Sequence, residues 1–212
     1  MEHKEVSKLV LKRLPGYLSY LKGMPAGGSA YISATALATA LGLGDVQVRK
    51  DLALVSDGGR PKVGYLRERL IEDISQFLGY DNTTDAILVG AGKLGQALLG
   101  YSGFEAYGLN ILAAFDQKAE CREAVDGKTI YDMSQLESFC NNNKILMGII
   151  TVPAEYAQEV CEKMINAGIK AIWNFAPVHL DVPDHILVQN ENMATSLAVL
   201  SMHLQAQMKD QR

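Results

Sequence analysis

The spacing of the hydrophobic residues changes near residue 80. Before that point, leucine, valine and alanine recur every three or four positions, which is the period of one face of a helix. The helices that this period predicts cover residues 6–21, 34–41, 46–55 and 66–78. Residues 1–80 are therefore expected to form a small, mainly helical domain.

Polar and glycine residues mark the ends of these predicted helices. Ser33 and Asp45 precede the second and third helices and are suited to act as N-caps, and Gly79 is suited to end the fourth. Residues 57–61, Asp-Gly-Gly-Arg-Pro, predict a hairpin turn, and residues 62–65 are expected to be extended. This order of helix, short helix, turn, helix and hairpin is typical of a winged helix-turn-helix domain.

After residue 80, short apolar segments alternate with amphipathic ones. The predicted strands cover residues 86–89, 111–115, 145–151, 171–175 and 186–188. One predicted helix follows residues 90–95 and ends at about residue 101, and the others cover 134–140, 153–167 and 191–208. Apolar strands separated by helices predict a parallel, Rossmann-like sheet that is covered on both faces, giving an α/β fold. We expect this domain to span residues 81–190, with a separate helical segment over 191–212.

Charge divides the chain at the same place. The 212 residues carry a net charge of −4, and an acidic chain taken whole argues against a nucleic-acid binder. However, residues 1–80 carry 11 Lys and Arg against 8 Asp and Glu, a net charge of +3. Residues 81–212 carry 9 against 16, a net charge of −7. The small basic domain can therefore have an anionic partner that the total charge conceals.

Cysteine and histidine usage excludes several classes of protein. The cysteines, Cys121, Cys140 and Cys161, are widely spaced and fit buried positions in a reducing cytoplasm rather than a disulfide framework. The histidines lack the spacing of zinc ligands, so we predict no metal site. The sequence offers neither the apolar segment of a signal peptide nor the roughly 18 apolar residues of a membrane span. We therefore expect a cytoplasmic protein without a membrane partner.

A glycine motif follows the first predicted strand of the second domain. Gly90, Gly92 and Gly95 form Gly-x-Gly-x-x-Gly, and Asp116 ends the next strand 21 residues later. In dinucleotide-binding domains these glycines permit a tight turn, close approach of the backbone to the pyrophosphate at the helix N-terminus, and close packing of helix on strand. The acid accepts from the ribose hydroxyls of NAD and repels the 2′-phosphate of NADP. We therefore predict NAD as the cofactor and interpret the neighbouring Lys118 as a solvated loop charge.

Residues for chemistry on such a cofactor are missing. A dehydrogenase needs a proton-transfer group beside the nicotinamide, yet no Tyr-x-x-x-Lys occurs and His179 is the one candidate histidine near a strand end. We predict that the cofactor is sensed and that the protein is not an enzyme. The alternatives are a small oxidoreductase with His179 or Tyr101 as the acid, and a regulatory protein that binds CoA or another nucleotide.

The basic domain offers side chains suited to DNA. The candidate DNA-binding residues are Gln47, Arg49 and Lys50 on the third predicted helix, and Arg60, Lys62, Gly64 and Tyr65 in the hairpin. In the major groove, glutamine can pair with adenine, and arginine or lysine with guanine. Cations on the hairpin are suited to phosphates or to a narrow minor groove. The alternative is an ordinary solvated basic face, but the combination of turn, helix and wing favours DNA.

Several short segments together resemble one known family. They are residues 46–52 (VQVRKDL), 63–65 (VGY), 89–95 (VGAGKLG), 101–104 (YSGF), 151–153 (TVP) and 174–177 (NFAP). With these motifs, the sequence resembles the Rex family of redox-sensing transcriptional repressors over nearly its whole length. The resemblance implies a homodimer that exchanges its C-terminal helix and binds a palindromic DNA operator. It also implies repression when NADH is scarce and release from DNA when NADH binds.

The resemblance extends the set of candidate cofactor-binding residues. The full set for NADH and NAD⁺ is Gly90, Ala91, Gly92, Lys93, Leu94, Gly95, Tyr101, Asp116, Gln117, Lys118, Thr151, Val152, Pro153 and Met193. Ser19 and Asn192 stand where the family often has an arginine and an aspartate that form part of its switch, and Met193 stands where a phenylalanine usually reaches toward the nicotinamide. We therefore expect an NADH response with altered coupling, in which Ser19 and Asn192 form a weaker, neutral hydrogen bond.

Overall fold

The chain divides into two compact units. The computed structural model describes residues 6–25, 27–117, 122–123 and 127–210. One unit comprises Met1–Asn82 with Ala106–Gly108, and the other comprises Thr83–Glu105 with Leu109–Arg212. The division lies close to residue 80, where the sequence pattern changes, and each unit is described by itself.

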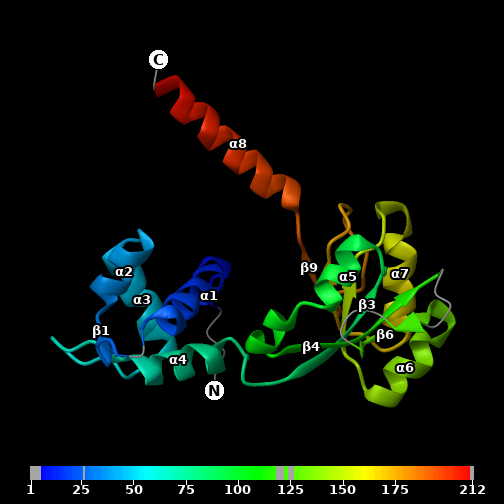
Figure 1. The fold of residues 1–212 in the computed structure, drawn as a ribbon, viewed down its shortest axis with the longest axis horizontal. Helices are drawn as coiled ribbons and strands as arrows, with labels where there is room; N and C mark the ends of the chain where they lie inside the picture. Colours follow the sequence, from blue (N-terminus) through cyan, green and yellow to red (C-terminus); the bar gives the residue numbers. More distant parts are fainter. Residues whose placement is uncertain (1–5, 26, 118–121, 124–126, 211–212) are drawn as a thin grey trace. The chain divides into compact units, whose positions relative to one another are not determined.

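The first unit is a small helical domain with a two-stranded antiparallel sheet (Figure 1). Its elements are α1 (Lys8–Gly23), β1 (Tyr31–Ile32), α2 (Ala34–Leu41), α3 (Asp45–Val55), β2 (Tyr65–Leu66) and α4 (Arg67–Phe77). Its core is built from the apolar faces of the helices, with Leu14, Leu37 and Leu52 fully buried. The four predicted helices are therefore present, and the two short strands close the wing.

The ends of these helices match the predictions in part. The Ser33 side chain accepts from the backbone N–H of Ala36 at 3.0 Å and caps α2 as expected. The prediction for Asp45 was wrong, because Gly44 is the N-cap residue of α3 and Asp45 is its first helical residue. The Asp45 carboxylate instead accepts from the Thr35 hydroxyl at 2.7 Å, which joins the start of α3 to α2.

The hairpin is tighter than predicted. Arg60 and Gly64 form an isolated antiparallel bridge, and the strand that follows contains only Tyr65 and Leu66. Lys62 has a φ of 64°, in the left-handed region, so residues 62–65 are not uniformly extended as the sequence pattern suggested. The turn, rather than a longer strand, brings the hairpin cations to the surface.

The second unit contains a sheet of seven strands within the described residues, in the order β5-β6-β4-β3-β7-β8-β9. These strands are β3 (Thr84–Val89), β4 (Leu109–Asp116), β5 (Arg122–Glu123), β6 (Thr129–Asp132), β7 (Met147–Ile150), β8 (Ala171–Asn174) and β9 (Leu187–Asn190). All neighbouring pairs are parallel except β5 with β6. Strands β5 and β6 were missed because two and four residues are too few to show a period.

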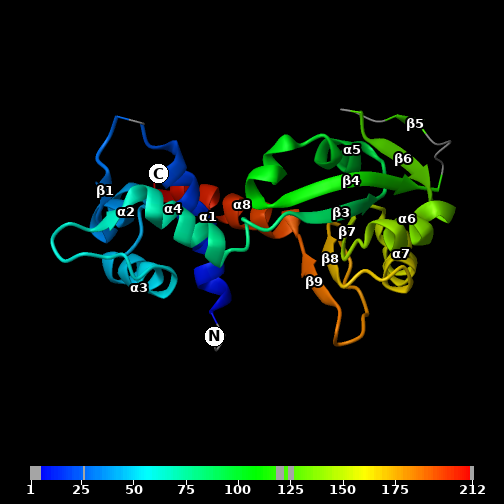
Figure 2. The same ribbon diagram turned by 90° about the horizontal axis from the view of Figure 1, so that it is seen from below.

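Helices cover both faces of this sheet (Figure 2). The helical elements are α5 (Lys93–Leu99), η1 (Ser102–Tyr107), η3 (Met133–Gln135), α6 (Leu136–Asn143) and α7 (Ala154–Asn166). Ile87 and Val89 of β3 pack in the core under α6 and α7, whereas Ala86 and Leu88 pack in the core that includes Leu99 of α5. Successive side chains of a strand point to opposite faces, so one buried strand supports both cores.

The buried cysteines belong to the core beneath α6 and α7. Cys140 and Cys161 are almost fully buried, and burial raises the pKa of each thiol to about 11. The thiols are therefore protonated near neutral pH and behave as small apolar side chains, as the sequence suggested. Cys121 lies outside the described residues.

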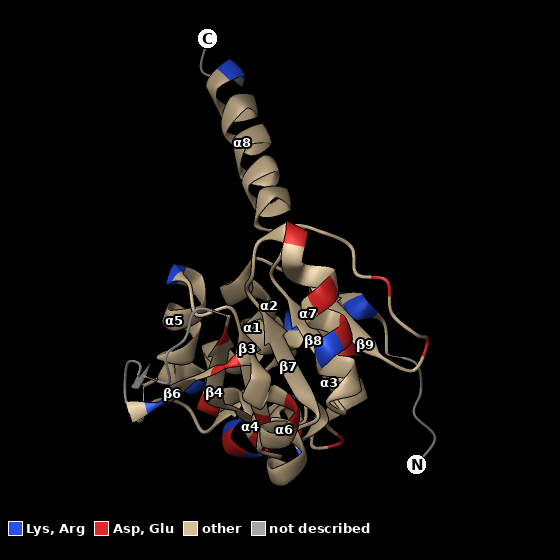
Figure 3. Ribbon diagram, turned by 90° about the vertical axis from the view of Figure 1, so that its right-hand side faces the viewer, with Lys and Arg blue, Asp and Glu red and all other residues tan. Residues whose placement is uncertain are grey.

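The last helix, α8 (Met193–Asp210), differs from the others in its surroundings. The side chains of residues 193–209 are exposed, including Leu197 and Leu200, each more than 60% accessible. Lys209 and Asp210 at its end are its Lys, Arg, Asp or Glu residues, so most of the α8 ribbon has the colour of other residue types (Figure 3). In the described residues, no helix has the length and hydropathy needed to cross a membrane.

Candidate functional site

The glycine loop joins the end of β3 to α5 and is held from two neighbouring strands. Gly90 has a φ of 105°, and its N–H donates to the carbonyl of Phe115 on β4 at 2.8 Å. The Thr151 hydroxyl, just beyond β7, donates to the Gly90 carbonyl at 2.7 Å. The turn is thus fixed at the carboxyl edge of three adjacent strands, where open α/β sheets bind ligands.

The other two glycines of the loop have different surroundings. A Cβ at Gly95 would collide with the Gly90 carbonyl oxygen, so the third glycine permits the close helix–strand packing that the motif predicts. A Cβ at Gly92 would meet no atom within 4 Å. Gly92 is also the N-cap residue of α5, and no side chain caps it. The backbone at Gly92 is therefore open to a ligand.

A cleft of about 290 Å³ lies along this edge of the sheet. Its lining residues are Val89, Gly90, Gly92, Asp116, Gln117, Met133, Thr151, Val152, Pro153, Tyr156 and Val160. Seven of the predicted cofactor-binding residues are thus brought together from segments far apart in the sequence. Sequence reasoning missed Met133 and Tyr156, whose placement depends on the unpredicted β6 and on the pitch of α7.

Asp116 ends β4 and lines the cleft, where the sequence pattern predicted an acid. One carboxylate oxygen accepts from the backbone N–H of Ala91 at 2.8 Å. The acid therefore has a structural role that the sequence did not reveal, because it ties the glycine loop to the neighbouring strand. Gln117 follows it at the exposed end of the strand.

The remaining predicted cofactor-binding residues do not line this cleft. Ala91, Lys93, Leu94 and Gly95 belong to the loop and the start of α5 without lining the cleft, and Lys118 lies outside the described residues. Tyr101 is 55% exposed after α5, and its ring packs edge-on against Phe104 with centroids 4.9 Å apart. Met193 is an exposed residue at the start of α8.

Asn192 has a local partner at the start of the last helix. Its side-chain oxygen accepts from the backbone N–H of Thr195 at 3.2 Å, which is the geometry of an N-cap. Ser19 is an exposed residue of α1. The expected hydrogen bond between Ser19 and Asn192 remains a prediction.

The recognition face of α3 presents all three predicted side chains to solvent. Gln47, Arg49 and Lys50 are exposed. Arg49 forms an ion pair with Asp45 one turn earlier, with 2.6 Å between guanidinium nitrogen and carboxylate oxygen. Both partners are substantially exposed, so this pair is weak enough to open when a stronger anion approaches.

A buried charged network anchors α3 to α1. Arg13 donates to both carboxylate oxygens of Asp51, at 2.8 and 2.9 Å, and the Tyr17 hydroxyl donates to the same carboxylate at 2.7 Å. Asp51 is only 3% exposed. Burial, aided by the hydrogen bond to Asp51, raises the pKa of Tyr17 to about 12. The network fixes the helix that carries the recognition face.

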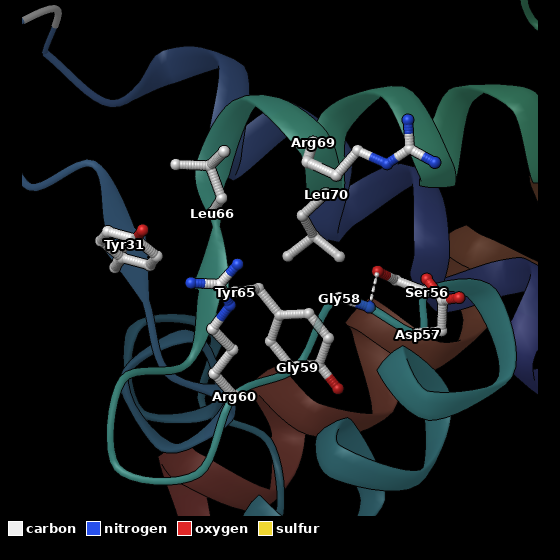
Figure 4. A pocket seen from close by; sticks show the side chains of 10 residues that line it. All are labelled: Tyr31, Ser56, Asp57, Gly58, Gly59, Arg60, Tyr65, Leu66, Arg69 and Leu70. Atoms are coloured by element: carbon white, nitrogen blue, oxygen red, sulfur yellow. Dashed lines mark hydrogen bonds between the residues drawn. The ribbon is translucent and has the colours of Figure 1, made fainter.

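The wing is braced against α4 and β1. Gly64 has a φ of 91°, and a Cβ there would collide with the carbonyl oxygen of Ile32. The Tyr65 ring covers Gly59, and burial raises the pKa of its hydroxyl. A pocket of about 330 Å³ lies between this hairpin and α4, with Arg60 at its edge (Figure 4). Arg60 and Lys62 remain exposed.

Beneath that pocket, a second buried acid holds the segment after α3. The Ser56 hydroxyl donates to Asp73 of α4 at 2.6 Å and accepts from the Gly58 N–H at 3.2 Å. Arg69 pairs with the other Asp73 oxygen at 2.9 Å. These contacts therefore fix the direction in which the chain runs from α3 into the hairpin.

The geometry gives little support to the alternative of a small oxidoreductase. His179, the candidate acid, is an exposed loop residue and does not line the cleft. Within the described ranges, no group of three or more His, Cys, Asp or Glu residues is arranged to hold a metal ion. The two units together have the architecture of a winged-helix domain joined to a Rossmann-like domain, the class of nucleotide-responsive DNA-binding proteins.

Comparison with known proteins gives the family. Residues 5–53 match the family model "Putative DNA-binding protein N-terminus", and residues 81–178 match the model "CoA binding domain". The Redox-sensing transcriptional repressor Rex of Treponema denticola is 42% identical over 193 residues, covering 91% of this chain and 92% of that protein. The Rex repressor of Clostridium beijerinckii is 40% identical over 200 residues, covering 94% and 95%.

Two solved structures are similar to this chain over nearly its whole length. RSP, a Rex-family repressor, in complex with β-NAD⁺ and operator DNA has a TM-score of 0.88 and 34% identity, covering 97% of this chain and 95% of its own. RSP in complex with β-NADH has a TM-score of 0.86 and 33% identity, covering 99% and 100%.

The chain belongs to the Rex family of redox-sensing transcriptional repressors. The expected family and the winged-helix and Rossmann-like fold are therefore confirmed, and the expected cofactor is the one present in the RSP complexes. Members of this family are repressors, so the prediction that the protein is not an enzyme is also confirmed.

Proposed function

We propose that this protein binds operator DNA through α3 and the wing, and that NADH bound at the glycine loop weakens that binding. The observation that carries the proposal is the glycine loop itself. Its backbone is open at Gly92, closed to side chains at Gly95, and bordered by an acid at the end of the next strand. RSP, at 34% identity, has been solved with β-NAD⁺ and operator DNA and also with β-NADH.

The cofactor would lie along the carboxyl edge of the sheet. Gly90, Gly92 and Gly95 would accommodate the pyrophosphate, and Asp116 would accept from the adenosine ribose. Thr151, Val152 and Pro153 would line the path to the nicotinamide, and Met133 and Tyr156 also line the cleft. Tyr101 and Met193 lie outside this cleft, and we assign them contacts with the nicotinamide.

Discrimination between NADH and NAD⁺ must arise at the nicotinamide. The two forms share the adenosine and pyrophosphate and differ by a hydride and one positive charge. Contacts with the glycine loop are the same for both forms, so they cannot make NADH and NAD⁺ act differently on an equilibrium between two conformations. A complete switch from 1:99 to 99:1 requires about 5.5 kcal/mol of differential binding.

DNA would be read by the exposed face of α3 and gripped by the wing. The side chains that we assign to the operator are Gln47, Arg49, Lys50, Arg60, Lys62, Gly64 and Tyr65. Two copies of α3 would enter successive major grooves about 34–36 Å apart, or a multiple of that spacing, on a palindromic site. A ligand that alters this spacing lowers affinity for DNA.

A second copy of the chain is the partner that α8 fits. Its leucine and methionine side chains are exposed in a single chain, and an isolated helix with such a surface is marginal in water. We propose that α8 is exchanged in a homodimer. In this arrangement, residues 1–80 read DNA, residues 81–190 bind NAD(H), residues 191–212 dimerise, and the protein acts in the cytoplasm.

The test is a titration of the full chain against DNA. A palindromic operator is first obtained by selection from random-sequence duplexes, and its affinity is then measured by fluorescence anisotropy with no ligand, with NAD⁺ and with NADH. NADH should weaken binding strongly and NAD⁺ should not. If NADH at 100 times its dissociation constant leaves the affinity unchanged, the sensor function is wrong.

A further inference from the structure

Gln47 is the one amide among the exposed candidates on α3. A glutamine reads adenine by using both ends of its amide, the NH₂ as a donor to N7 and the oxygen as an acceptor from N6. That pairing requires the whole amide to face the groove. The chemistry of Gln47 therefore depends on whether another residue of the protein occupies one end.

Arg13 of α1 occupies that end. Two of its nitrogens, Nη1 and Nε, lie 2.8 and 3.1 Å from the side-chain oxygen of Gln47 when the amide is turned toward them. Both arginine nitrogens are donors only, so an NH₂ group in that place would set donor against donor. The physically consistent arrangement is that the Gln47 oxygen accepts from Arg13 and the NH₂ group points away.

Arg13 is itself held in place. Its side chain is 20% exposed, and it donates to both oxygens of Asp51, whose side chain is 4% exposed. The Tyr17 hydroxyl, fully buried, holds the same carboxylate. Swinging Arg13 away from Gln47 would leave a buried carboxylate without its cation, which is costly. The orientation of Gln47 is therefore imposed by α1.

We infer that Arg13 is a specificity-determining positioning residue, which makes Gln47 a donor-only reader of DNA. This inference rests on the proposed function, because it concerns how α3 reads the operator. A donor-only amide suits the acceptors of thymine O4 and guanine O6 and N7. It disfavours cytosine, which offers a donor at N4, and with adenine it keeps one bond to N7 but leaves the neighbouring N6 donor without an acceptor. The position facing Gln47 in each half-site should therefore be thymine or guanine.

The test compares base preference among three full-length proteins. The wild type, Asp51→Asn, and the double variant Arg13→Met/Asp51→Asn each select duplexes from a random-sequence library. Asp51→Asn removes the same buried charge but keeps Arg13, whose N–H groups still oppose the Gln47 NH₂ group and favour its oxygen, so it is the matched control for the loss of Arg13. The double variant removes the cation and the buried charge together and frees the amide.

The control should select the same bases as the wild type. The double variant should shift at one position per half-site from thymine or guanine toward adenine, by about tenfold in relative affinity, which is the scale of one bidentate contact. Unchanged preference in the double variant would overturn the role of Arg13 alone. A wild type that selects no sequence would instead overturn the proposed function, and this inference with it.

A second pair of variants tests the same claim if the double variant does not fold. Gln47 is exposed, so its substitution leaves the core intact. Gln47→Ala should lose the preference at that position, whereas Gln47→Glu, pinned by Arg13, should present an acceptor and select cytosine there. Adenine preferred by the wild type at the position that Gln47→Ala loses would contradict the donor-only assignment.

Discussion

The glycine loop and the recognition helix are two binding surfaces built in opposite ways. The loop works by lacking side chains: a Cβ at Gly95 collides with the Gly90 carbonyl, and Gly92 is left open. The recognition helix works by its side chains, and residues of the same domain contact them: Arg13 contacts Gln47, and Asp45 pairs with Arg49. A backbone site is therefore visible in a short motif, whereas a side-chain site depends on residues far away in sequence.

The cores beneath the two surfaces also differ, in the number of polar residues that they bury. Among the described residues, the buried polar positions of the first unit are Asp51, Ser56 and Asp73, and in the second unit Asn174 is the buried polar residue. The first unit thus fixes the direction of α3 and the wing with directional hydrogen bonds. The second unit packs apolar strands beneath its loop and ties the loop with the Phe115 carbonyl, the Thr151 hydroxyl and the partly buried Asp116 carboxylate.

The largest effect is expected at the third glycine of the loop. Gly95→Ala forces a methyl group against the Gly90 carbonyl, so the free energy of unfolding should fall by about 3 kcal/mol and NADH binding should be lost. Urea unfolding and calorimetric titration measure the two effects.

Gly92→Ala is the matched control for that change. Gly92 has a φ of −71° and open space around it, so stability should change by less than about 1 kcal/mol. The added methyl group should still impede the pyrophosphate and weaken NADH binding about tenfold or more. Equal loss of stability in both variants would contradict the distinct roles of the two glycines.

A buried acid of the first unit gives the next largest effect. Asp51→Ala leaves Arg13 without its carboxylate and should lower the free energy of unfolding by about 3 kcal/mol. Asp73→Ala is a milder change, because the Arg69 partner is 60% exposed, and should cost about 1 kcal/mol. Chemical denaturation of both variants compares them directly, and the reverse order would contradict the importance of the α1–α3 network.

An exposed cation of the recognition helix should affect DNA without affecting the fold. Arg49→Ala removes a surface ion pair, so its thermal unfolding should match that of the wild type. Its operator affinity should fall by about 1–3 kcal/mol, with relaxed preference at one base. Unchanged affinity in a gel-shift titration would exclude Arg49 from the interface.

The smallest effect is expected at the acid beside the cleft. Asp116→Ala should weaken both NAD⁺ and NADH by roughly tenfold, because it removes a charged acceptor for the ribose. Asp116→Asn keeps an oxygen for the Ala91 N–H and should bind NADPH better than the wild type does, because the repelling charge is gone. Calorimetry that finds no loss in either variant would refute the ribose role.

The sequence predicted much of the fold and the centre of the cofactor cleft. The glycine motif, the acid at residue 116 and the helices of the first unit follow from local patterns, and the structure contains them. The strand at residues 129–132 was missed because four residues show no clear period. Met133 and Tyr156 enter the cleft only through that strand and through the pitch of α7. The contact between Arg13 and Gln47 spans 34 positions, and no local pattern reveals it.

The central claim is that NADH at the glycine loop controls the recognition helix, and one measurement tests it most directly. Operator affinity is titrated with NADH for the wild type and for Gly92→Ala, whose DNA-binding surface is unaltered. The account predicts that NADH weakens operator binding by the wild type, whereas the variant needs about tenfold more NADH, or still more, for the same weakening. Equal weakening of both proteins, or of neither, would contradict it.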